Sequence, residues 1–188
     1  MFMENWKKEI RTVPNLLSLL RLVLLPVYLG LYLRGQYLLA GGILLISCLT
    51  DLLDGYLARR FHQVTDLGKV LDPLADKVTQ LTMTGCLSLR YPVLKPVLWL
   101  LMVKEAFQLA VGIGFLRRGR VLSGALMAGK ISTAVLFASL TGLVMFPELP
   151  AKLVKAAALT DGILLSIAFL SYCLAYFGPI PGLQDAEG

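Results

Sequence analysis

Long apolar runs follow one another along most of the chain, and they constrain its fold more than any other feature. A helix needs about 18 to 25 such residues to cross roughly 30 Å of hydrocarbon. Six stretches meet this length, at residues 15–33, 37–60, 69–89, 94–116, 123–146 and 153–177. Only 16% of the residues are charged, and the mean hydropathy of +0.74 exceeds that of soluble domains. The sequence therefore predicts an all-α integral membrane protein with about six transmembrane helices.

The segments that separate these runs are short and carry turn residues, so we expect one membrane domain, at residues 15–178. An amphipathic juxtamembrane segment at 1–14 precedes it, and a polar tail at 179–188 follows it. No small-residue cleavage site follows the first run, which is therefore expected to stay as a span. The three cysteines fall inside the runs and give no disulfide or metal pattern.

The basic residues indicate which ends of the runs face the cytoplasm, because short cytoplasmic loops are rich in Lys and Arg. With the N-terminus inside, the inner segments contain the densest basic cluster, at Arg117, Arg118 and Arg120. The outer segments contain fewer basic residues, so we expect both termini to be cytoplasmic. The net charge of +6 then lies mostly on the inner side, where it suits anionic lipids or a phosphorylated substrate better than nucleic acid.

Four aspartates interrupt the apolar pattern on the two sides of one cytoplasmic loop. Asp51 and Asp54 are three residues apart in the second run, and Asp72 and Asp76 are four residues apart in the third. Because residues at these spacings share one face of a helix, each pair forms a stripe. If the two stripes face each other, four carboxylates share a small volume and must take up protons or bind a cation. Such a cluster suits Mg²⁺, Ca²⁺ or Mn²⁺, so we predict a divalent metal site.

Two other interpretations of these acids are open. Asp72 and Asp76 could stabilise a helix N-terminus that Asp66 caps, but Asp51 and Asp54 lie well before the end of their helix, where no dipole favours them. A cation transporter or channel would also carry intramembrane acids. It would place them near the midplane and repeat them in the second half of the chain, whereas all four lie at one membrane face.

Small residues accompany the acids. Gly55 and Ala58 continue the stripe of the second run, and Gly68 precedes the acids of the third. They leave room for a flat ligand, although close helix packing is an alternative reason for them. The full pattern is Asp51-x-x-Asp54-Gly55-x-x-Ala58-Arg59, eight residues, then Gly68-x-x-x-Asp72-x-x-x-Asp76.

This pattern resembles in full the signature of the CDP-alcohol phosphatidyltransferases. The stretches VPNLLSLLRLVLLPVYL (13–29) and LDPLADK (71–77) are similar to those of the bacterial phosphatidylglycerophosphate synthases and related cardiolipin synthases, and the chain resembles the former most. The resemblance implies a six-helix enzyme of phospholipid biosynthesis, commonly a homodimer, in the bacterial cytoplasmic membrane with its active site facing the cytoplasm. It also implies transfer of a phosphatidyl group from CDP-diacylglycerol to an alcohol with release of CMP, and two divalent ions, Mg²⁺ or Mn²⁺.

The resemblance assigns roles to residues of the motif by position. It implies that Asp51, Asp54 and Asp72 hold metal, and that Asp76 contributes to the second ion and is the general base. A carboxylate that accepts the alcohol's proton and cations that neutralise the leaving phosphate are what displacement at a pyrophosphate needs.

Binding of the CDP-lipid is assigned in the same way. The residues implied are Gly55, Ala58 and Gly68 beside the cytidine nucleotide, Arg59 at its phosphates, and Asn15 and Arg21 in the first run. Arg59 could instead be a positive-inside anchor, and Asn15 could instead cap the helix after Pro14.

The acceptor site is expected on the same cytoplasmic side. Its candidate phosphate-binding residues are Arg117, Arg118, Arg120 and Lys130. The family's glycerophosphate-using enzymes often have Arg-Glu in the fourth span and Gly-Lys-x-Lys-Thr in the fifth, where this chain has Lys104-Glu105 and Gly129-Lys130-Ile131-Ser132-Thr133. Glycerol 3-phosphate is the favoured acceptor, and phosphatidylglycerol, the acceptor of a cardiolipin synthase, is the alternative. Lys104 and Glu105 are adjacent, so we expect each to face a cavity or another helix.

Overall fold

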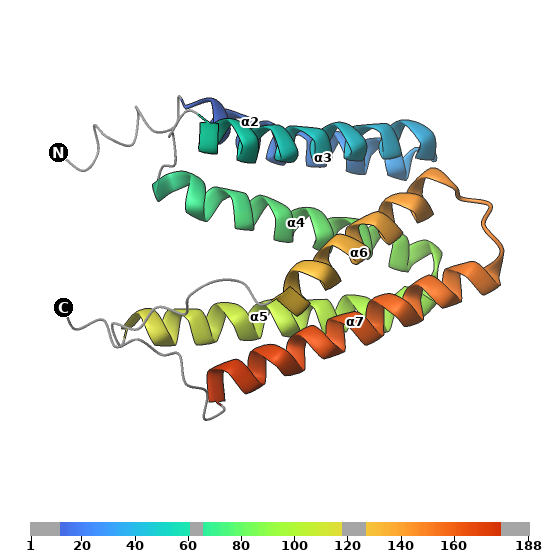
Figure 1. The fold of residues 1–188 in the computed structure, drawn as a ribbon. Helices are drawn as coiled ribbons and strands as arrows, with labels where there is room; N and C mark the ends of the chain where they lie inside the picture. Colours follow the sequence, from blue (N-terminus) through green and yellow to red (C-terminus); the bar gives the residue numbers. More distant parts are fainter. Residues whose placement is uncertain (1–11, 61–65, 118–126, 178–188) are drawn as a thin grey trace. The chain divides into compact units, whose positions relative to one another are not determined.

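The computed structural model describes residues 12–60, 66–117 and 127–177, and the side chains at 13–14, 51–60, 66–72 and 115–117 are not part of that description. Within these ranges the chain is helical and has no strand (Figure 1). The elements are α2 (Val13–Leu33), α3 (Tyr37–Arg60), α4 (Asp66–Arg90), the 3-10 helix η1 (Pro92–Leu94), α5 (Lys95–Arg117), α6 (Met127–Met145) and α7 (Ala151–Phe177). The predicted all-α class is confirmed.

Within the residues that the structure describes, four helical segments are long and apolar enough to cross a membrane. These candidate spans are Asn15–Leu33, Pro92–Gly114, Met127–Met145 and Ala151–Tyr176. Among the side chains that the structure describes, the apolar stretch of α3 is Tyr37–Thr50. The N-terminal half of α4 is rich in charged residues, which lowers its hydropathy.

The chain divides into two compact units. The first comprises Met1–Leu87 and Leu140–Glu148, and the second comprises Ser88–Ser139 and Leu149–Gly188. In the first unit α2 and α3 lie side by side along their length (Figure 1). Gly41 on α3 allows close packing against the last residue of α6 in the same unit, because Met145 Cγ occupies the place that a Cβ would fill.

The turn between α2 and α3 explains their antiparallel pairing. Gly35 has φ +75°, in the left-handed region that favours glycine, and ends α2. Its N–H donates to Tyr32 O at 3.0 Å, and Gln36 N–H donates to Leu31 O at 3.0 Å. These bonds satisfy carbonyls at the end of α2 and send the chain directly into α3, as expected for a short loop containing glycine.

In the second unit α5 packs against α7 (Figure 1). Aromatic side chains fill part of the contact. The Phe107 ring lies edge-on to Phe169, with centroids 5.2 Å apart, and 6.0 Å from Tyr176. Tyr172 stacks on Tyr176 at 6.2 Å. Offset and edge-on contacts of this kind add to the stabilisation that comes from burying the rings.

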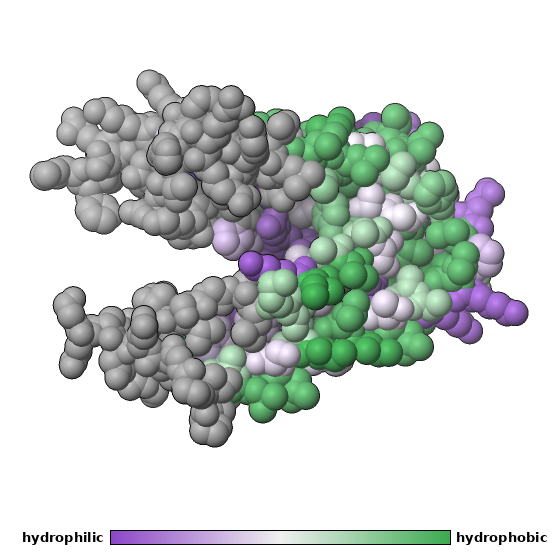
Figure 2. Space-filling model, viewed as in Figure 1, coloured by the Kyte–Doolittle hydropathy of each residue, from purple (hydrophilic) through white to green (hydrophobic). Residues whose placement is uncertain are grey.

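Large apolar side chains also cover the outside of the described helices. On α7 they recur every three or four residues and form one exposed stripe, at Leu159, Ile163, Ile167, Leu170 and Leu174. The coloured surface in Figure 2 is likewise mainly hydrophobic. A water-soluble protein would not expose such continuous apolar area, whereas a helix surrounded by lipid does.

Candidate active site

A stripe of buried polar residues runs along the first half of α2. Asn15, Ser18 and Arg21 are spaced by three residues, so they share one face of the helix, and they are 1%, 0% and 2% exposed. Thr12, and not Asn15, is the N-cap of α2, so the alternative role of Asn15 as the cap is wrong. Polar groups are costly inside an apolar span unless they have partners.

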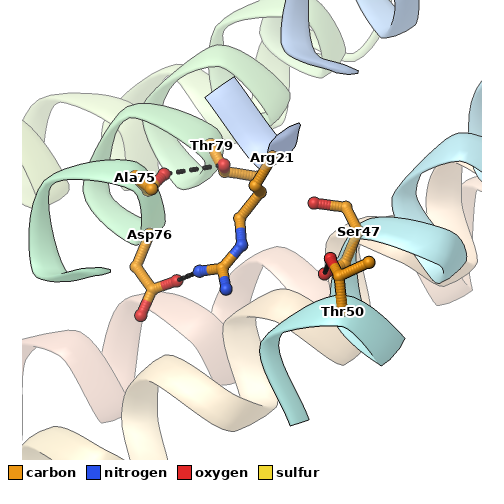
Figure 3. Close-up of polar contacts among 6 residues, drawn as sticks. All are labelled: Arg21, Ser47, Thr50, Ala75, Asp76 and Thr79. Atoms are coloured by element: carbon orange, nitrogen blue, oxygen red, sulfur yellow. Dashed lines mark hydrogen bonds and ion pairs between the residues drawn. The ribbon is translucent and has the colours of Figure 1, made fainter. Parts of the chain in front are cut away.

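Arg21 makes an ion pair with Asp76, the last aspartate of the motif. Its Nη1 donates to Asp76 Oδ1, and the bond joins α2 to α4 (Figure 3). The Arg21 side chain is 3% exposed, whereas that of Asp76 is 46% exposed. Arginine keeps its charge in proteins, so a buried guanidinium requires an acidic partner. The buried guanidinium of Arg21 thus holds the half-exposed carboxylate of Asp76.

Hydroxyl groups near this pair bond to their own helices. Thr79 Oγ1 donates to Ala75 O, and Thr50 Oγ1 donates to Ser47 O, each at 2.7 Å (Figure 3). Back-bonding of this kind lets a helix in an apolar environment carry polar side chains at little cost. Because these two hydroxyl groups donate to their own helices, the charge of Arg21 is balanced by a carboxylate, which Asp76 supplies.

The motif falls on the two helices where it was expected. Asp51 and Asp54 lie on α3, nine and six residues before its end at Arg60, and Asp72 and Asp76 lie on α4. Asp66 is the first residue of α4 and not a residue preceding it. The side chains of Asp51, Asp54, Gly55, Ala58, Arg59, Gly68 and Asp72 lie outside the described ones. Convergence of the four carboxylates therefore stays a prediction.

Among the described side chains, no three His, Cys, Asp or Glu residues come together. Three of the four expected ligands, Asp51, Asp54 and Asp72, lie outside the described side chains, so the metal site stays a prediction.

The acceptor candidates are described only in part. Lys130 is exposed in the first turn of α6, and Arg117 is the last residue of α5, with its side chain not described. Arg118 and Arg120 lie outside the described residues. Whether these four residues form one site stays a prediction.

The expectation for Lys104 and Glu105 is wrong. The two side chains are bonded to each other, Lys104 Nζ to Glu105 Oε1 at 2.6 Å, and they are 4% and 12% exposed. Neighbouring residues leave a helix in different directions, but both stems are long and flexible enough for the charged ends to meet. Inside an apolar span, two paired charges cost far less than two separate ones.

One buried acid was not singled out from the sequence. Asp161 on α7 is 1% exposed, and Ser139 Oγ on α6 donates to its Oδ2 at 2.8 Å. An ionisable residue in the middle of a predicted span was the signal that could have identified it. The bond connects two helices within the second unit.

Gly129, next to Lys130, is in close contact with α7. A Cβ at this position would overlap the Tyr172 hydroxyl and lie 3.0 Å from ring atoms Cε2 and Cζ, whereas one at Gly142 of the same helix would meet nothing within 4 Å. We therefore expect Gly129→Ala to cost about 1 to 3 kcal/mol by overpacking and to lower the melting temperature in detergent. Gly142→Ala, the control, should leave it unchanged or raise it, because Ala favours a helix by up to about 1 kcal/mol. Equal effects of the two substitutions would contradict the contact.

Comparison with known proteins agrees with the motif. The family model of the CDP-alcohol phosphatidyltransferases matches residues 11–173. The chain is 39% identical to the CDP-diacylglycerol–glycerol-3-phosphate 3-phosphatidyltransferase of Aquifex aeolicus over 132 residues, 69% of this chain and 72% of that protein. It is 40% identical to the cardiolipin synthase (CMP-forming) of Streptomyces coelicolor over 58% of this chain and 54% of that protein.

A third relative covers nearly the whole chain. The probable phosphatidylglycerophosphate synthase of Mycobacterium tuberculosis is 29% identical over 93% of this chain and 87% of its own length. The chain therefore belongs to the CDP-alcohol phosphatidyltransferase family, and is an integral membrane enzyme of phospholipid biosynthesis that transfers a phosphatidyl group from CDP-diacylglycerol.

Proposed function

We propose that the enzyme transfers the phosphatidyl group to glycerol 3-phosphate and so forms phosphatidylglycerophosphate and CMP. The observation that carries the proposed site is the half-exposed Asp76 carboxylate, which the buried Arg21 holds from another helix. The acceptor is supported by the names of the Aquifex aeolicus and Mycobacterium tuberculosis relatives. An exposed Lys130 at the start of α6 provides a cation for the acceptor's phosphate.

In the proposed reaction, a hydroxyl oxygen of the acceptor forms a bond to the phosphorus that carries diacylglycerol. The bond from that phosphorus to the oxygen of CMP breaks, and CMP leaves with the bonding electrons. Asp76 accepts the hydroxyl proton as general base. Its half exposure is consistent with this role, because the acceptor has to reach it.

The donor set of the motif fits divalent metal ions. Asp51 and Asp54 on α3 and Asp72 and Asp76 on α4 supply carboxylate oxygens only, the ligands that Mg²⁺ and Mn²⁺ prefer. We propose that these four residues hold two such ions. When bound, the ions would neutralise negative charge on the pyrophosphate and the leaving CMP.

The CDP-lipid is proposed to bind beside these acids. Gly55, Ala58 and Gly68 would leave room for the cytidine nucleotide, and Arg59 would contact its phosphates. Asn15 would contribute from α2, where it is buried on the polar stripe with Arg21. All of these residues belong to the first unit of the chain.

We further propose six membrane spans, formed by α2 to α7, in one domain at residues 15–178 between a juxtamembrane segment (1–14) and a tail (179–188). With six spans both termini lie on the same side, which the basic residues identify as the cytoplasm. The motif then faces the cytoplasm, in a bacterial cytoplasmic membrane. A homodimer is proposed from the family resemblance alone.

Cardiolipin synthesis is the second candidate. The Streptomyces coelicolor relative favours it, because it is named a CMP-forming cardiolipin synthase and is 40% identical. Its acceptor would be phosphatidylglycerol, which arrives through the bilayer. The transporter alternative loses its support, because a transferase family model matches residues 11–173.

The acceptor is tested by supplying CDP-diacylglycerol to the purified enzyme with glycerol 3-phosphate, phosphatidylglycerol, inositol phosphate or serine separately. We expect phosphatidylglycerophosphate from glycerol 3-phosphate, identified by mass spectrometry. Lys130→Ala should raise the KM for glycerol 3-phosphate about tenfold, the value of one charge-assisted hydrogen bond of roughly 1.5 kcal/mol. Lys152→Ala, an exposed lysine on α7, is the control and should leave this KM unchanged. Cardiolipin formed only from phosphatidylglycerol would refute the proposed acceptor.

A further inference from the structure

The contact between Arg21 and Asp76 suggests a role for Arg21 other than binding the phosphates of the CDP-lipid. Nη1 of Arg21 donates to Asp76 Oδ1, and the two residues are 55 positions apart on different helices (Figure 3). We infer that Arg21 is a positioning residue, which holds the Asp76 carboxylate in the orientation that accepts the acceptor's proton. This inference rests on the proposed function, in which Asp76 is the general base.

A half-exposed aspartate on a helix needs such a constraint. The torsion that turns a carboxylate about its own axis has broad, shallow minima, so Asp76 alone would present its oxygens in many directions. A general base has to lie within hydrogen-bond reach of the proton it removes, in a defined direction. Fixing Oδ1 by a charge-assisted bond removes most of that freedom.

Arg21 is suited to provide this constraint because it is itself held. Its side chain is 3% exposed, so packing restricts its rotamers, and its guanidinium is a planar group with a fixed arrangement of donors. The helix that carries it is packed along α3, and Gly35 sets the turn between the two. A rigid cation from one helix thus fixes a mobile anion on another.

The two possible roles of Arg21 predict different kinetics. If Arg21 bound the lipid's phosphates in the ground state, removing it would raise the KM for CDP-diacylglycerol. If it acts through Asp76, removing it should lower kcat and leave both KM values nearly unchanged, because the base is used only on the way to the transition state.

The test is a double-mutant cycle of Arg21→Met and Asp76→Asn, assayed as CMP release at saturating Mg²⁺. We expect Arg21→Met to lower kcat at least about tenfold, part of the 10² to 10⁴ that a general base contributes. In the Asp76→Asn background, Arg21→Met should cause almost no further loss, because the carboxylate it orients is gone. Arg34→Met, an exposed arginine just after α2, is the control and should behave as wild type.

A second substitution covers the case in which Arg21→Met does not fold. Arg21→Lys keeps the charge but not the planar fork, so it should retain an intermediate kcat with unchanged KM values. A raised KM for CDP-diacylglycerol with intact kcat, or losses that multiply in the double variant, would overturn the inference. Failure of the proposed base would look different, because Asp76→Asn alone would then either keep its kcat or lose affinity for CDP-diacylglycerol as much as it loses kcat.

Discussion

Replacing Asp51, Asp54 or Asp72 by Asn should lower CMP release from CDP-diacylglycerol at least roughly a thousandfold, since several kcal/mol of charge stabilisation are lost at the transition state. Asn keeps the size of the side chain but removes one negative charge and one carboxylate oxygen, which weakens a divalent metal site directly. Each variant is measured by CMP release from purified protein over a range of Mg²⁺ concentrations.

Asp66→Asn is the matched control for this series. Asp66 begins α4, the same helix that carries Asp72, but it is outside the motif. It should retain near wild-type activity and lose at most about 1 kcal/mol of stability, the usual contribution of a charge near a helix N-terminus. If the three motif variants behave like Asp66→Asn, the four aspartates do not form the metal site.

Asp76→Asn should lose far more turnover than lipid affinity. A general base contributes roughly 10² to 10⁴ in rate, so kcat should fall by about that factor. The KM for CDP-diacylglycerol should change little, because Arg59, Asn15 and the small residues of the motif are proposed to bind the lipid. Steady-state kinetics with both substrates varied measures the two parameters separately.

The Asp76→Asn variant needs a stability control. The substitution also removes the acid that pairs with the buried Arg21, so melting temperatures must be compared first. If affinity for CDP-diacylglycerol falls as much as kcat does, Asp76 is mainly a ligand and the base is another group.

The sequence predicted the helices well because apolar runs of membrane-spanning length leave few alternatives. The second predicted span, 37–60, coincides with α3, and the last, 153–177, differs from α7 only at its start. There α7 begins at Ala151, directly after Pro150, whose carbonyl accepts the N–H of Leu153 at 2.9 Å. Pro150 is a signal for a helix start in the sequence, but hydropathy alone did not give the correct first residue of α7.

Contacts between helices could not be predicted in the same way. Periodicity placed Asp76 on a stripe with Asp72, and Asn15 and Arg21 were noted on the first run. Periodicity did not indicate that Arg21 would reach Asp76, because the pattern on one helix does not determine which face of another helix packs against it. The bond from Ser139 to Asp161 was missed for the same reason.

The Lys104 and Glu105 pair shows a different limit of prediction from the sequence. The backbone geometry of adjacent helical residues argued against contact, and that argument holds for short side chains. Long side chains can adopt several rotamers. In an apolar span the attraction between unlike charges favours the rotamers in which the ends of Lys104 and Glu105 meet.

The proposal that Asp51, Asp54, Asp72 and Asp76 work with divalent ions is tested most directly by CMP release from CDP-diacylglycerol. The wild-type enzyme is assayed with its acceptor, first in chelator and then after addition of Mg²⁺ or Mn²⁺. We expect no CMP in chelator and full recovery when either ion is restored, with no recovery in Asp54→Asn at the same ion concentration. Undiminished CMP release in chelator would show that these aspartates do not work through divalent ions.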